Sequence, residues 1–159
     1  MTKIAVLHPA FSLGGAAAVA MWAVEALKAD NEVDLVTTEP VDIEECNTFF
    51  GTTIRVGEIR VLGIPPLGPE QLHGVLVKVA SAERYYRRSK MRYDLAIATR
   101  CEMDLGGFGI QYMHCPIWDD RVLRAIGQLP PGWRYRRGPL RWTYRHLAVS
   151  YTHLRAHET

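Results

Sequence analysis

Short apolar runs alternate with longer segments of helical periodicity along most of this chain. The apolar runs predict five strands, at residues 4–7, 32–38, 59–64, 94–98 and 110–114. The segments between them predict helices, at residues 15–29, 41–47 and 69–90, and another begins near residue 140. Apolar strands separated by helices are typical of a parallel sheet covered on both faces. We therefore expect a doubly wound α/β fold.

The first strand leads through a short loop with Gly14 and Gly15 directly into a helix. Apolar residues recur there at three- and four-residue spacing, and we expect this set to be the buried face: Val19, Trp22, Ala23, Ala26 and Leu27. In doubly wound sheets ligands bind where strands end and helices begin. Adjacent glycines let the backbone approach a ligand, and a helix N-terminus attracts anions. A tight turn without further role stays open, since the spacing differs from the Gly-x-Gly-x-x-Gly of dinucleotide sites.

The last residues, 149–159, read as the in-frame translation of a transposon-end sequencing adapter. All of them agree with one reading frame, and the preceding adapter bases also fit Ala148. We therefore expect residues 148–159 to be a non-native tail, and the helical spacing of His153 and His157 to carry no meaning for metal binding. Residues 1–147 are then expected to form one domain of a protein that continues further.

The overall composition is ordinary for a globular chain, with 48% hydrophobic and 23% charged residues. No apolar stretch approaches the roughly 20 residues needed to span a bilayer. The three cysteines are widely spaced and indicate neither a disulfide framework nor a metal site. We expect a cytoplasmic protein that holds no metal ion.

Charge is distributed unevenly along the chain. Residues 1–80 contain five Lys or Arg and ten Asp or Glu, whereas residues 81–159 contain fourteen and seven. Two clusters in the basic half interleave arginine with aromatic residues, at 84–90 and 133–142. Such clusters fit a solvated helix face with a basic loop, peripheral contact with anionic lipid headgroups, or nucleic-acid binding. No recognised binding module accompanies the charge, so we expect no nucleic-acid partner and leave peripheral membrane contact open.

Three segments together resemble a known family. They are the opening strand with Gly14 and Gly15, the strand at residues 93–98, and residues 109–116, which read Gly-Ile-Gln-Tyr-Met-His-Cys-Pro. In this order and spacing they resemble the N-terminal domain of the GT-B-fold glycosyltransferases, in particular the family 4-like retaining enzymes. The resemblance covers residues 3–147 and implies a Rossmann-like domain. In such enzymes this domain mainly holds the acceptor, and a second domain holds the nucleotide-sugar.

The resemblance implies that the full-length protein is a hexosyltransferase acting from a nucleotide-sugar donor on a sugar or lipid-linked acceptor. Gly14 and Gly15 would approach the donor diphosphate or sugar. His114 would hydrogen-bond a sugar hydroxyl from the end of the fifth strand, with a purely structural role as the alternative. These three are expected substrate-binding residues, and no catalytic residue, metal or cofactor is assigned. Because the chain lacks the motif-bearing second domain, we expect it to be inactive by itself.

Two other functions remain open. The main alternative is a stand-alone nucleotide- or cofactor-binding Rossmann-like module without catalysis. A dehydrogenase-type domain would use Glu39, after the second strand, as its ribose-binding acid. His8 also ends a strand, and Arg100, Glu102 and Asp104 follow the fourth strand, where a solvated loop is the simpler interpretation.

Overall fold

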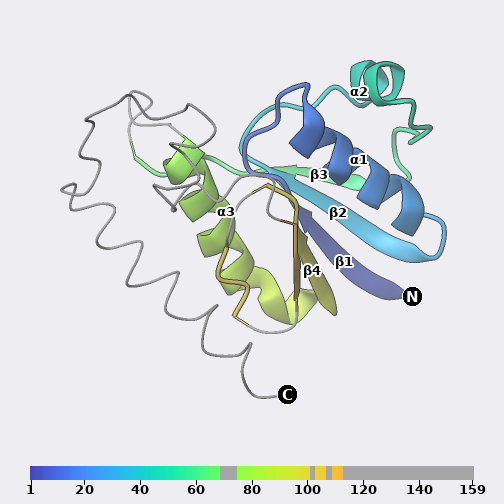
Figure 1. Ribbon diagram of the computed structural model, residues 1–159. Helices are drawn as coiled ribbons and strands as arrows, with labels where there is room; N and C mark the ends of the chain where they lie inside the picture. Colours follow the sequence, from blue (N-terminus) through green and yellow to red (C-terminus); the bar gives the residue numbers. More distant parts are fainter. Residues whose placement is uncertain (69–74, 101–102, 107–108, 113–159) are drawn as a thin grey trace, which may run out of the picture. The chain divides into compact units, whose positions relative to one another are not determined.

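A computed structural model describes residues 1–68, 75–100, 103–106 and 109–112 (Figure 1). By compactness the chain divides into two units, Met1–His114 and Cys115–Thr159, and every described residue belongs to the first. This first unit is an α/β, Rossmann-like domain built on a parallel sheet, as the alternation of apolar runs and helical segments predicted. His114, residues 133–142 and the expected tail lie outside the described residues, so the expectations for them stay predictions.

The five strands of this sheet are all parallel and lie in the order β3-β2-β1-β4-β5. Their bounds are β1 Thr2–Leu7, β2 Asn31–Thr37, β3 Arg60–Gly63, β4 Leu95–Ala98 and β5 Gly109–Gln111. The chain moves outward from β1 to β3 and then returns to the other side of β1. In doubly wound sheets ligands bind at such a reversal, at the carboxyl ends of the strands.

Helices cover the sheet on both faces. They are α1 (Gly15–Leu27), α2 (Ile43–Phe50) and α3 (Val75–Ser89), which continues into the 3₁₀ turn η2 (Lys90–Arg92). Figure 1 shows α1 and α2 on one side of the strands and α3 on the other. The bounds of α2 follow from its ends: the Asp42 side chain accepts hydrogen bonds from the N–H groups of Glu44 and Glu45, and Gly51 ends the helix with φ 71°.

The main core lies between the sheet and the α1–α2 layer. Buried apolar side chains from both layers form it: Ile4, Val6, Ala20, Met21, Val24, Val33, Leu35, Ile43, Cys46, Ile54, Ile59 and Ile97. On β1 and β2 these are alternate residues, as expected for strands with one face toward this layer. The residues between them face α3.

The buried face of α1 differs from the predicted one. The buried residues are Ala16, Ala17, Ala20, Met21 and Val24. Trp22, expected inside, is instead 52% exposed, and Ala26 is exposed as well. The helix is apolar on almost every side, so both sets satisfy the same spacing. The period therefore predicts the helix correctly but does not select which apolar face meets the sheet.

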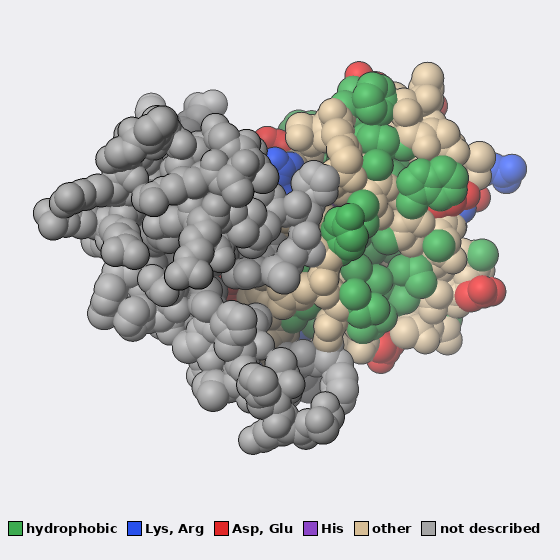
Figure 2. Space-filling view, viewed as in Figure 1, with side chains coloured by type: hydrophobic (Ala, Val, Ile, Leu, Met, Phe, Trp, Pro, Cys, Tyr) green, Lys and Arg blue, Asp and Glu red, His purple; other side chains and the backbone are tan. Residues whose placement is uncertain are grey.

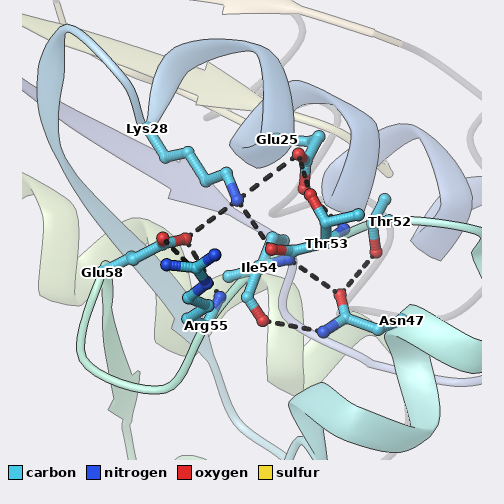
Figure 3. A network of polar contacts seen from close by, with 8 residues as sticks. All are labelled: Glu25, Lys28, Asn47, Thr52, Thr53, Ile54, Arg55 and Glu58. Carbon is cyan, nitrogen blue, oxygen red and sulfur yellow. Dashed lines mark hydrogen bonds and ion pairs between the residues drawn. The ribbon is translucent and has the colours of Figure 1, made fainter.

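A polar network fixes the last turn of α1 to the segment between α2 and β3 (Figure 3). It comprises Glu25, Lys28, Asn47, Thr52, Thr53, Ile54, Arg55 and Glu58. The Lys28 Nζ lies 2.8 Å from a Glu58 carboxylate oxygen and 3.3 Å from one of Glu25. These contacts raise the pKa of Lys28, the hydrogen bond to Glu58 contributing most. The network ties three segments together at the end of α1 remote from the glycine loop.

A buried carboxylate lies on the α3 side of β2. Asp34 is fully buried and accepts hydrogen bonds from Arg60 Nε at 2.8 Å, Arg60 Nη2 at 2.7 Å and the Tyr93 hydroxyl at 2.8 Å. Burial, followed by the hydrogen bond to Asp34, raises the pKa of Tyr93 well above its ordinary value. The ring of Tyr86 stacks on that of Tyr93 with 6.2 Å between centroids, which joins α3 to this cluster.

Candidate functional site

The carboxyl ends of the three central strands are joined by backbone hydrogen bonds that continue past the strands themselves. The N–H of His8 donates to the carbonyl oxygen of Val36 at 2.9 Å, and the N–H of Thr99 donates to that of Leu7 at 3.1 Å. These bonds hold the residues that follow β1 and β4 in a fixed position. The backbone at the edge where ligands are expected is therefore fixed where it leaves the sheet.

His8 is the first of these residues after β1. Its side chain is fully buried, with Nδ1 2.9 Å from Thr99 Oγ1, and its ring makes an edge contact with Phe11 at 4.9 Å between centroids. These contacts join β1, β4 and the loop toward α1. They support a structural role for His8 rather than contact with a substrate.

The glycine loop has a conformation that does not itself require glycine. Gly14 is the N-cap of α1 with an extended backbone, φ −172° and ψ 179°, and neither Gly14 nor Gly15 has a positive φ. A Cβ placed on Gly14 would meet only the Ser12 carbonyl oxygen, at 3.8 Å. Gly15, the first residue of α1, is exposed. A tight turn therefore gives no reason for two glycines here, whereas space for a ligand would give one.

The N-terminus of α1 favours negative charge. Gly14 offers no side-chain cap, and the first turn contains no acidic residue. The N–H groups of this turn have no acceptor within the helix, and they lie at the positive end of its dipole. An anion brought to this loop would meet donors that have no acceptor within the helix.

Arg100 reaches the same loop from the end of β4. Its Nη1 donates to the carbonyl oxygen of Ala10, four residues before Gly14. Among the described residues no carboxylate forms an ion pair with Arg100. A planar guanidinium suits two-point contact with phosphate or carboxylate. The loop between β1 and α1 therefore lies beside a cation that is not neutralised within the described part of the chain.

Glu39, the residue that a dinucleotide-binding domain would use for ribose, is already engaged. Its carboxylate forms an ion pair with Lys78 of α3, and its N–H donates to Thr37 Oγ1 at 3.1 Å. A ribose would share this carboxylate with Lys78, so the pairing gives no support to the dehydrogenase-type alternative.

Asp104 differs from the expectation for the loop that follows β4. Asp104 forms an ion pair with Arg87 on α3 and accepts from the N–H of Gly106 at 2.8 Å, so it holds the loop after β4 rather than projecting as part of a solvated one. Glu102 and His114 lie outside the described residues. Sequence reasoning gave Arg100 no role, although its position directly after a strand was a usable signal. The contact of Lys78 with Glu39 depends on how α3 packs and had no sequence signal.

Neither thiol nor metal chemistry finds support in the described residues. Cys46 is buried, and burial raises the pKa of its thiol, so the reactive thiolate is disfavoured. No group of three His, Cys, Asp or Glu side chains within the described ranges could hold a metal ion. None of the helices in those ranges is long and apolar enough to cross a bilayer.

The fold and this edge define an α/β, Rossmann-like domain with one arginine, Arg100, beside its first strand–helix loop. Comparison of the chain with protein-family models, with curated proteins and with solved structures gives no match in any of the three. What the domain binds therefore has to be argued from the site alone.

Proposed function

We propose that the full-length protein is a retaining glycosyltransferase that takes a hexose from a nucleotide-sugar, and that this chain supplies its acceptor-side domain. The observation that carries the proposal is the contact of Arg100 with the Ala10 carbonyl oxygen, in the loop that leads to Gly14 and Gly15 at the carboxyl edge of the central strands. Helix N–H groups and a guanidinium there would stabilise the charge that builds on a departing diphosphate. The sugar acceptor would lie along the same edge, above the ends of β1 and β4.

His114 has a definite part in this proposal. It follows β5 by three residues, so a sugar hydroxyl at the edge could be its hydrogen-bonding partner. Such a bond acts on orientation and binding rather than on proton transfer. A neutral hydrogen bond of this kind contributes about 0.5–1.5 kcal/mol, and up to about 3 kcal/mol if one group is charged.

The test begins with the gene. Sequencing past codon 147 should reveal a second α/β domain with paired glutamates, and the complete product should transfer hexose from UDP- or GDP-linked donors. Transfer is measured as release of the nucleoside diphosphate in the presence of sugar or lipid-linked acceptors. A complete product that binds nucleotides without transferring sugar would instead establish the stand-alone module.

Gly15→Val tests the loop in that complete enzyme. The branched side chain would occupy the space over the first turn of α1, and we expect kcat/KM to fall at least about tenfold, or about 1.4 kcal/mol. Ala26→Val is the matched control, because it adds the same side chain to an exposed position near the other end of α1. Equal activity of both variants and wild type would remove the glycine loop from the site.

His114→Ala tests the second substrate contact. The bond energies above correspond to a fall in kcat/KM of roughly twofold to 160-fold with the fold intact. A lower melting temperature with normal activity per folded molecule would assign His114 a structural role.

A further inference from the structure

The side of α1 that faces away from the sheet is apolar and uncharged. We define the outer face of α1 as Ala18, Val19, Trp22 and Ala26; the first two are half-buried, Ala26 is exposed and Trp22 is 52% exposed. The single charged residue of α1 is Glu25, and its carboxylate is held by Thr53 and Lys28 in the network of Figure 3. A helix that is apolar on all sides is normally covered on all sides.

Carboxylates without cationic partners among the described residues lie on the neighbouring helix, α2. α2 packs in the same core cluster as α1, and its first turn exposes Glu44 and Glu45, which form no ion pair with any described residue. Residues 1–68 contain four Lys or Arg against nine Asp or Glu. All four of these cations already have carboxylate partners. Figure 2 shows the hydrophobic side chains of this part of the molecule with acidic side chains at their margins.

We propose that the outer face of α1 is a docking surface for a cationic amphipathic helix of a partner protein. The partner's apolar side chains would pack on Trp22 and the small residues around it, and its Lys or Arg side chains would meet Glu44 and Glu45. Large aromatic side chains are the usual anchors of such interfaces. Helices that present an apolar face flanked by charge dock in this way.

Charge complementarity distinguishes this partner from two others. In a symmetric pair of identical chains, the acidic first turns of α2 would border the same interface twice, and like charges would repel. An anionic lipid surface would be repelled by the same carboxylates. Of these three partners, only a cationic helix would be attracted by the carboxylates of Glu44 and Glu45.

The direct test uses three labelled peptide probes on the full chain. One is an amphipathic helix of leucine and lysine, the second replaces every lysine by glutamate, and the third replaces every leucine by serine. Fluorescence anisotropy should show binding of the leucine–lysine probe only. Added salt should weaken that binding, because screening reduces the attraction between exposed charges.

Variants then locate the surface. Trp22→Ala should weaken binding of the leucine–lysine probe at least about tenfold, as expected for loss of an interface anchor. The double variant Glu44→Gln/Glu45→Gln should weaken it about threefold or more and reduce the salt dependence. Tyr112→Ala is the matched control and should change nothing, because Tyr112 is 47% exposed after the edge strand β5, whereas α1 contacts β1 and β2.

Four results would overturn the proposal. One is equal binding of the leucine–lysine probe by wild type and Trp22→Ala with far-ultraviolet circular dichroism unchanged. Another is a dimer in sedimentation equilibrium that Trp22→Ala dissociates, which would assign the face to a second copy. The third is binding to vesicles of phosphatidylcholine and phosphatidylserine that Trp22→Ala abolishes, which would assign it to a membrane. Absence of binding by any probe would equally contradict a cationic partner.

Discussion

Replacing Asp34 by asparagine should destabilise the domain more than any other single removal of charge in its described part. The substitution keeps the size of the side chain but removes the carboxylate, whose two oxygens accept three hydrogen bonds, two from Arg60 and one from Tyr93. Asparagine has one acceptor oxygen and adds two N–H donors. At least one of the three donors must then lose its acceptor, and an N–H group takes the place of a carboxylate oxygen.

The size of the effect follows from burial. Asp34 has no exposed surface, whereas the Arg60 side chain is 55% exposed to water and already forms a second ion pair with Glu32 at 3.0 Å. Removing one member of a fully buried charge pair costs about 3–5 kcal/mol. Because Arg60 retains solvent and a second carboxylate, we expect a value at or below the lower end, about 2–3 kcal/mol.

Urea unfolding followed by circular dichroism at pH 7 would measure this loss, which corresponds to a fall in melting temperature of roughly 6–12 °C for a chain of this size. Asp30→Asn is the matched control, because Asp30 is exposed and forms no ion pair with the described residues, so its effect should stay within about 0.5 kcal/mol. A loss below about 0.5 kcal/mol for Asp34→Asn would show that burial of this carboxylate costs as much as its hydrogen bonds return.

Three further substitutions test other parts of the fold. Tyr93→Phe should reduce the loss of stability at alkaline pH. Because the pKa of Tyr93 is raised in the folded state, the unfolded chain releases this proton first, and the wild type loses stability as the pH rises above about 10. Equal dependence of the free energy of unfolding on pH in both proteins, measured by urea titrations from pH 8 to 11, would contradict this. Lys28→Met should lower the free energy of unfolding by about 1 kcal/mol and make it less dependent on salt, because one cation serves two carboxylates, and an unchanged salt dependence would argue against it. Gly109→Ala should lower the free energy of unfolding by about 1–3 kcal/mol, because the new Cβ would overlap Leu105 and lie 3.1 Å from the Ala96 carbonyl oxygen. Adding Leu105→Ala should recover part of this loss. Full stability of Gly109→Ala alone would refute the crowding.

The strands and helices were predictable because each follows from local periodicity and from residues at its own ends. β1, β2 and β4 differ from their expected bounds by at most two residues. The alternation of apolar runs with helical segments, which predicts the sheet, can be recognised from short stretches of sequence. The buried face of α1 was not predictable in the same way. Two apolar faces share one period there, and the choice between them depends on contacts with strands and α2.

The polar clusters also depend on contacts between residues far apart in the sequence, so they could not be predicted from local sequence. Asp34 stands within an apolar strand, and its partners Arg60 and Tyr93 are 26 and 59 residues away in the sequence. Nothing local to Asp34 indicates that pairing. At the candidate site, the position of Gly14 and Gly15 between a strand and a helix was predictable. The approach of Arg100 to the Ala10 carbonyl was not, because it depends on β4 lying beside β1.

The groups that stabilise the domain lie largely apart from the groups that would bind a ligand. The Lys28 network is at the end of α1 opposite Gly15, and Asp34 lies within β2 on the α3 side. The carboxyl edge itself is held by backbone hydrogen bonds and by the buried contact of His8 with Thr99. Changes at Gly15 therefore alter the space at the edge without removing the bonds that hold the strands in place. A loss of transfer activity in Gly15→Val at unchanged stability would consequently report on ligand binding at this edge, which makes the functional proposal separable from the stability of the fold.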